Sequence, residues 1–104
     1  MSQHTFKSTA SDGRVVTVLM GYDRPLNYVF CTVFDSGDEV LYSNLRDEHA
    51  GTDQQSIEYY RPILKSLSID LPESVVREIT NDQNGRVGNR VLVHHPDIQE
   101  RKAP

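Results

Sequence analysis

The stretch that decides the fold is Val15–Phe34, which reads VVTVLMGYDRPLNYVFCTVF. Its two ends are rich in β-branched and aromatic residues, which favour β-strands. Between them, Gly21–Tyr28 carries the Gly, Asp, Pro and Asn residues that turns use. The sequence therefore predicts two neighbouring strands, Arg14–Met20 and Tyr28–Phe34, joined by a loop over 21–27 that is longer than a tight hairpin needs.

The rest of the chain adds three expected strands: His4–Ala10, Glu39–Ser43 and Val87–His94. The first contains a single large apolar residue, Phe6, which is typical of a strand at the edge of a sheet. Strand 28–34, in contrast, has apolar residues on both of its alternating faces. We therefore expect strand 28–34 to be central and covered on both sides.

The first helical segment is expected after a polar loop. Thr52 and Gln55 have the spacing of a capping box, which predicts a helix start here. Apolar residues then recur at helical spacings, at Ile57, Tyr60, Leu64 and Leu67. Pro62 either kinks this helix or splits it into two short pieces. Because the apolar register continues across Pro62, we expect one kinked helix.

A second helix is expected to begin at Asp70, which can cap its N-terminus while Glu73 completes another capping box. Its apolar stripe consists of Leu71, Val75, Val76 and Ile79. Asn84-Gly85 is typical of a helix end in which glycine takes the left-handed conformation.

These elements give the order ββββααβ, with strands and helices segregated along the chain, which is typical of an α+β domain. We expect an antiparallel sheet of four to five strands, packed on one face by two helices. The domain is expected to cover residues 1–95, followed by a flexible C-terminal tail at 96–104. Since two helices can cover one face of such a sheet but not both, we expect a second copy of the chain to cover the other face in a homodimer.

The charge balance argues against several function classes. The chain has 11 Lys and Arg against 15 Asp and Glu, a net charge of −4. It therefore lacks the cationic surface that direct nucleic-acid binding or attachment to an anionic membrane requires. One cysteine among 104 residues excludes an internal disulfide, and the N-terminus has no apolar leader. These features predict a cytoplasmic protein.

Cys31, His94, His95 and Asp97 are the first candidates for chemistry. Cys31 lies in the middle of a predicted strand, where a free cysteine is typically a small buried hydrophobic residue. The two histidines are neighbours on a predicted strand and point to opposite faces, so they can share a metal ion with Asp97 only if the strand ends before them. The segment 85–88 has two glycines but no nucleotide-binding pattern. We therefore expect no metal and no cofactor.

The loop residues Tyr22, Asp23, Arg24 and Tyr28 are the strongest candidates for contacts with a partner. Tyrosine and arginine are enriched among the residues that contribute most to protein–protein binding. Exposed loops on a rigid scaffold are also where binding residues concentrate. The sequence therefore predicts that this loop anchors another protein.

Asp47 and Glu48, in the loop after strand 39–43, are expected to add an acidic rim to this partner site. Beside them, His49 leaves a second hypothesis open, a small enzyme that uses His49 with Asp47 or Glu48 for acid–base catalysis. A third hypothesis is a small-molecule-binding domain with a cavity beneath the two helices. The loop residues favour a non-enzymatic interaction or accessory protein, such as an inhibitor or a scaffold.

Overall fold

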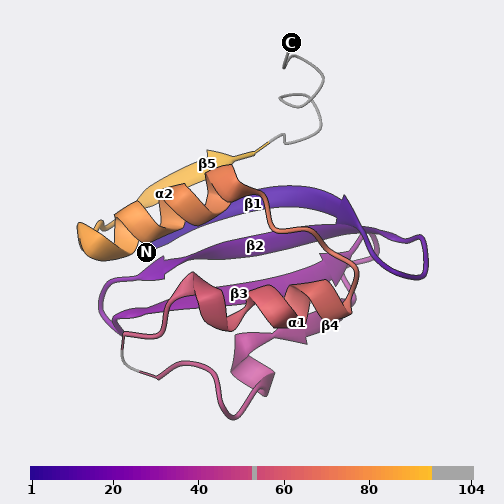
Figure 1. Cartoon of the computed structure of the whole chain (residues 1–104), viewed down its shortest axis with the longest axis horizontal. Coiled ribbons are helices and arrows are strands. Elements are labelled where there is room, and N and C mark those ends of the chain that lie inside the picture. The colour runs from indigo at the N-terminus through magenta and orange to yellow at the C-terminus, as the bar shows by residue number, and fades with distance from the viewer. Residues whose placement is uncertain (53, 95–104) are drawn as a thin grey trace.

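The computed structural model of the chain describes residues 1–52 and 54–94. Within them a single sheet carries both α-helices on the same side (Figure 1). The strands are β1 (Ser2–Thr9), β2 (Val15–Asp23), β3 (Tyr28–Asp35), β4 (Val40–Ser43) and β5 (Arg90–Val93). The helices are α1 (Arg61–Ser66) and α2 (Glu73–Asn84), with 3-10 turns η1 (Asn44–Arg46) and η2 (Ile57–Tyr59). The predicted tail, 96–104, lies outside the described residues.

The sheet has the strand order β4-β3-β2-β1-β5 and is mixed. The first four strands form an antiparallel meander, whereas β5 pairs in parallel with β1 and places Leu92 opposite His4. The α+β class is therefore confirmed, but the expectation of a purely antiparallel sheet is wrong. The long connection from β4 to β5 carries both helices, and such a crossover lets β5 run parallel to its neighbour. β5 also displaces β1 from the edge position predicted for it.

Alternating residues of the sheet bury one face against the helices. On β2 these residues are Val16, Val18 and Met20, and on β3 they are Val29, Cys31 and Val33. The helical side of the core supplies Ile57, Tyr60, Leu64, Val75 and Ile79. These residues confirm the apolar faces predicted for both helical segments. β3 is an interior strand, paired with β2 and β4 as expected of a central strand, and β2 takes the middle position because β5 extends the sheet beyond β1.

The connection after β2 is shorter than the sequence predicts. β2 continues through Gly21 and Tyr22 to Asp23, so the turn consists of Arg24–Asn27. Gly21 allows this extension, because a Cβ at this position would lie 1.9 Å from the Ser2 carbonyl oxygen of β1. The residues predicted as the first half of a loop are therefore part of the sheet.

Pro62 splits the first helical segment in two instead of kinking one helix. The helix α1 begins at Arg61, after η2, with Pro62 in its first turn. Proline is tolerated there because its missing amide hydrogen has no intrahelical partner to lose. The predicted cap, Thr52, does not start this segment. Ser56 does, since its hydroxyl accepts a hydrogen bond from the Glu58 amide at 3.3 Å.

Both ends of α2 also differ from the prediction. The helix begins at Glu73 after the extended residue Pro72, so Asp70 is not its cap. At the other end Gly85 has a right-handed conformation with φ −87°, and Arg86 has the left-handed one with φ 50°. An arginine therefore occupies the left-handed position expected for glycine, at a cost in conformational energy.

The opposite face of the sheet has no helix over it in the described part of the chain (Figure 1). Leu19 and Phe30 are half-buried there, and Val91 and Val93 of β5 are 73% and 61% exposed. The chain itself therefore covers β3 on one side, and the cover expected for its other side stays a prediction.

Candidate functional site

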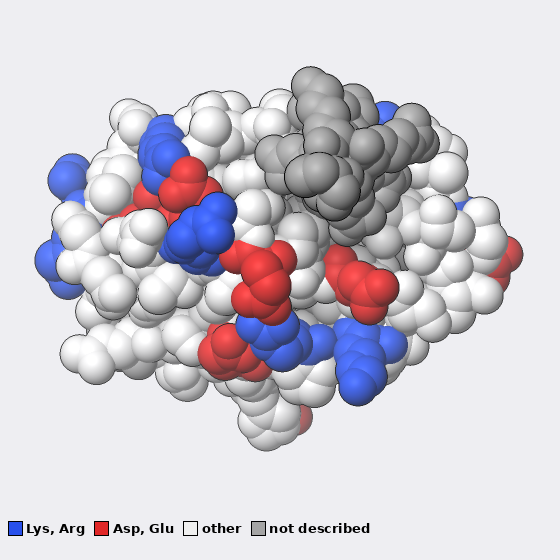
Figure 2. Space-filling model, turned by 45° about the horizontal axis from the view of Figure 1, so that its top comes forward, with Lys and Arg blue, Asp and Glu red and all other residues white. Residues whose placement is uncertain are grey.

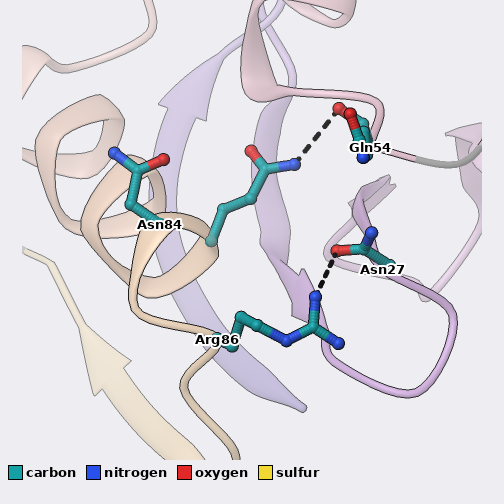
Figure 3. A pocket seen from close by; sticks show the side chains of 5 residues that line it. Asn27, Gln54, Asn84 and Arg86 are labelled. Carbon is teal, nitrogen blue, oxygen red and sulfur yellow. Dashed lines mark hydrogen bonds between the residues drawn. The ribbon is translucent and has the colours of Figure 1, made fainter.

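A polar hollow opens between the β2–β3 turn, the loop before η2 and the C-terminal end of α2 (Figure 3). Its volume is about 410 Å³. The residues that line it are Asn27, Gln54, Gln83, Asn84 and Arg86. We call this hollow the amide pocket, because four of its five lining residues are Asn or Gln. None of the five is among the site residues that the sequence predicts.

Three of the lining residues have a left-handed backbone conformation. Their φ angles are 56° at Asn27, 64° at Gln54 and 50° at Arg86. Asparagine tolerates this region through its short side chain, whereas glutamine and arginine adopt it at a cost in conformational energy. Two other non-glycine residues of the described chain, Asp38 and Ser68, share the conformation. Strained backbone is therefore concentrated around the amide pocket, which is typical of functional sites.

Hydrogen bonds hold the walls of the amide pocket together. The Tyr22 hydroxyl donates to Asn27 Oδ1 at 2.7 Å. Arg86 Nη1 donates to the same oxygen at 3.4 Å, and Figure 3 shows the two side chains approaching each other from separate segments. Gln83 Nε2 donates to the Gln54 carbonyl oxygen at 3.3 Å. The turn, the loop and the end of α2 therefore position one another at the pocket.

Tyr22 and Asp23 have structural roles in the turn. Tyr22 is fully buried, so the expectation that it is an exposed anchor is wrong. Residues two apart on a strand lie on the same face of the sheet, so Tyr22 lies on the same buried face of β2 as Met20. Asp23 closes the turn, because its Oδ1 accepts a hydrogen bond from the Leu26 amide at 3.3 Å.

Arg24 and Tyr28 stay closer to the surface, on either side of the turn. Arg24 is exposed, and its guanidinium lies against Gly88, where a Cβ would be 3.4 Å from Arg24 Cζ. Tyr28 is half-buried, and its ring lies against Gly51, where a Cβ would be 3.1 Å from the ring. Of the predicted contact residues, Arg24 is therefore the one placed beside the segment that follows Arg86.

Asp47 organises the loop after β4. Its Oδ2 accepts hydrogen bonds from the hydroxyls of Tyr42 (2.7 Å) and Tyr59 (2.8 Å), and its Oδ1 accepts one from the His49 amide (3.0 Å). The hydrogen bonds from Tyr42 and Tyr59 lower the pKa of the Asp47 carboxyl group. A carboxylate stabilised in its charged form is a weak proton acceptor, so this geometry favours a structural role for Asp47 over catalysis.

The other side chains considered for chemistry are placed apart from the amide pocket lining. Glu48 and His49 pair at 3.6 Å with side chains 88% and 80% exposed, and such a pair stabilises a fold little. Burial raises the pKa of the Cys31 thiol to about 12, which disfavours the reactive thiolate. His95 and Asp97 lie outside the described residues.

Charged residues of both signs are mixed on the surface. On the face shown in Figure 2, acidic and basic groups lie side by side, and neither sign forms a broad patch. Pairs of this kind join Arg61 to Glu58 at 2.8 Å and Arg90 to Glu78 at 3.1 Å. Recognition on this face is therefore expected to depend on local contacts more than on long-range attraction.

Comparison of the chain with protein-family models, with curated proteins and with solved structures gave no match. The part of the chain that the structure describes contains no helix long and apolar enough to cross a membrane.

Proposed function

We propose that this domain is a non-enzymatic protein-interaction module, and that its amide pocket receives a carboxylate-bearing segment of a partner protein. The observation that carries the proposal is the convergence of three left-handed residues, one of them an arginine, at a polar hollow. Strain of this kind is retained where a specific arrangement of side chains is needed.

The side chains of the amide pocket favour a carboxylate as the group that is bound. The Arg86 guanidinium is an exposed fork of donors that matches the two oxygens of a carboxylate. Within residues 1–52 and 54–94, no acidic group lies within 4.0 Å of it. The exposed amides of Gln54 and Asn84 can donate further hydrogen bonds. Arg24 adds a second cation on the neighbouring turn.

The same lining supports binding over catalysis. Asparagine, glutamine and arginine side chains do not change their protonation state near neutral pH, so they are not general acids or bases. Pockets for small molecules are lined mostly by apolar and aromatic residues, which the lining of the amide pocket lacks. A polar segment of another protein therefore fits this site better than a drug-sized ligand.

Affinity capture from the lysate of the source organism tests the interaction itself. Three versions of the tagged chain are compared: wild type, Arg86→Gln and Arg77→Gln. Arg77 is an exposed arginine of α2, so both variants lose the same charge. A stoichiometric partner is expected with wild type and Arg77→Gln and is expected to be lost with Arg86→Gln. Equal capture by all three versions would place the interaction elsewhere on the surface.

Peptide titration tests the chemistry of the bound group. An acetylated, amidated peptide with an Asp-Glu sequence is compared with its Asn-Gln counterpart at low ionic strength, where exposed charges are screened least. The acidic peptide is expected to shift the NMR signals of Arg86 Nε–H and of the Asn84 side-chain amide. Equal shifts from the neutral peptide would contradict carboxylate recognition.

Self-association through the open face of the sheet is a second candidate function, favoured by the position of both helices on the other face (Figure 1). We propose that a second copy covers the exposed side chains of Val91 and Val93. Light scattering of the Val91→Lys/Val93→Lys variant is expected to show a monomer where the wild type is a dimer. Leu45→Lys, at a residue that is 86% exposed in η1, is the control and should remain dimeric. A monomeric wild type would end this hypothesis.

A further inference from the structure

A buried polar cluster joins β1, α2 and β5. His4 Nε2 lies 2.6 Å from Asp82 Oδ2, and Arg90 Nη1 donates to Asp82 Oδ1 at 2.6 Å. The other ring nitrogen of His4, Nδ1, lies 2.9 Å from His94 Nε2. His4 is fully buried, and the Asp82 side chain is 1% exposed. Asp82, His4 and His94 therefore form one hydrogen-bonded chain across three elements.

The charged and polar groups around His4 come from every element packed against it. They are Ser2 on β1, Glu78 and Asp82 on α2, Arg90 on β5 and His94 directly after β5, while β2 presents the apolar side chain of Met20. Arg90 Nη2 donates to Glu78 Oε1 at 3.1 Å. Arg90 thus bridges the carboxylates of Asp82 and Glu78 beside the buried His4 ring.

Asp82 is held in its ionised form. Burial alone raises the pKa of its carboxyl group, but hydrogen bonds from His4, Arg90 and Ser2 outweigh burial and lower the pKa. An ionised carboxylate can only accept hydrogen bonds, so His4 Nε2 carries a hydrogen. The His4 ring is therefore either neutral with a bare Nδ1 or a cation with hydrogens on both nitrogens.

The contact between His4 and His94 tolerates one added proton but not two. When both rings are neutral, His94 Nε2 donates its hydrogen to the bare His4 Nδ1. When one proton is added to His94 Nδ1, the shared hydrogen moves from His94 Nε2 to His4 Nδ1, so the hydrogen bond persists with its direction reversed. A second proton puts hydrogens on both facing nitrogens, which lie 2.9 Å apart, and the contact is lost.

We propose that Asp82, His4 and His94 form a proton-binding relay that fixes the end of β5 and releases it when both imidazoles are charged. β5 is suited to release because, among the described strands, it pairs with β1 alone, and because Val91 and Val93 are largely exposed. The His94 amide donates to the Thr5 carbonyl oxygen at 2.8 Å. Loss of the contact between the His4 and His94 rings therefore removes a support beside this backbone hydrogen bond.

Native-state hydrogen exchange of the full chain, measured by NMR between about pH 5 and 8, tests the relay. The protection factor of the His94 amide reports opening at the end of β5, and that of the Val18 amide in the central strand reports global unfolding. When the end of β5 is open, the His4 and His94 rings together bind one more proton than when it is closed. The His94 protection factor is therefore expected to fall by up to about tenfold per pH unit on acidification, while that of Val18 stays constant.

Two variants separate the relay from general effects of acid. His94→Gln keeps an amide that can donate to His4 Nδ1 or accept from it, but it cannot take up the second proton. Its protection at residue 94 is expected to be independent of pH. His49→Gln removes an exposed histidine and is expected to behave as the wild type. Equal loss of protection in wild type and His94→Gln, or constant protection in the wild type, would overturn the relay.

Imidazole ¹⁵N spectra of the wild type give a second measurement that needs no variant. The relay requires a hydrogen on His4 Nε2 throughout the titration, because this atom donates to Asp82. It also requires that His4 Nδ1 is bare at high pH and protonated after the first step. A His4 ring with a bare Nε2 would overturn the proposal even if His94→Gln did not fold.

Discussion

Helix α2 ends in two polar regions that are neighbours in sequence but differ in environment. Asp82 is buried, with hydrogen bonds to His4 and Arg90 at 2.6 Å each. The next two residues, Gln83 and Asn84, line the open amide pocket. A buried polar group is stable only if the fold satisfies its hydrogen bonds, whereas a group beside a pocket keeps capacity for a ligand. The difference in burial therefore gives Asp82 a structural role and leaves Gln83 and Asn84 as candidate binding residues.

Tyr22 connects the two regions. Its amide donates to Ser2 Oγ at 3.0 Å, and the Ser2 side chain in turn hydrogen-bonds Asp82. Its hydroxyl donates to Asn27 Oδ1 at the amide pocket. The satisfied buried cluster thus stabilises the scaffold, and the scaffold holds the strained residues of the pocket in place.

The largest expected effect breaks the buried region. Asp82→Asn removes the charge that binds Arg90 and the fixed acceptor for His4, and it is expected to lower the free energy of unfolding by about 3 kcal/mol. Because the folded pKa of Asp82 is lowered, its contribution to stability is fully present above its unfolded pKa of about 3.9 and is lost as the pH falls from there through the lower folded pKa. Urea denaturation at pH 7 and pH 3 measures both effects.

Asn84→Ala is the matched control for Asp82→Asn, since the two residues share the last turn of α2. Asn84 is exposed, so its substitution is expected to change stability by no more than about 0.5 kcal/mol. Similar losses in the two variants would contradict the difference drawn between the buried and open regions.

A smaller effect is expected where Tyr22 links the regions. Tyr22→Phe removes the hydroxyl that donates to Asn27 and is expected to lower the free energy of unfolding by about 1 kcal/mol. Tyr28→Phe is its control, because the Tyr28 hydroxyl has no hydrogen bond in the described structure. Chemical denaturation measures stability, and the NMR signals of the Asn27 side-chain amide report the pocket. Unchanged Asn27 signals in Tyr22→Phe would show that the link does not position the pocket.

The smallest expected effect is a gain in stability. Arg86→Gly relieves the left-handed strain at φ 50° and is expected to raise the free energy of unfolding by about 0.5 kcal/mol while it weakens partner binding. Asp38→Gly, at φ 64° in the β3–β4 turn, is expected to give a similar gain without an effect on binding. Loss of stability in Arg86→Gly would mean that Arg86 supports the fold and not a ligand.

Local patterns made much of the scaffold predictable. Alternation along the strands and spacings of three and four along the helices identify the buried faces, as at Val18 and Ile79. The same pattern carried an unused signal for the buried cluster, because Asp82 follows Val75 and Ile79 on the apolar stripe of α2. A carboxylate on an apolar stripe indicates a buried partner, although the sequence does not say which residue it is.

The amide pocket could not be predicted in this way. Asn27, Gln54 and Arg86 come from three separate segments, and no local pattern indicates that they meet. Left-handed conformations were expected at glycines, and a glutamine and an arginine adopt them here. Such conformations depend on tertiary contacts that outweigh the local preference of the residue.

The sequence by itself determined the α+β class, the apolar faces and the net negative charge, because these depend on composition and on periodicities of two and 3.6 residues. The tertiary structure alone decided that β5 runs parallel to β1, that Tyr22 is buried, and that the walls of the amide pocket meet. These features arise from contacts between residues far apart in the chain, such as the approach of Ser2 to Gly21 and of His4 to Asp82. Their free energies depend on packing and burial, which no local sequence pattern contains.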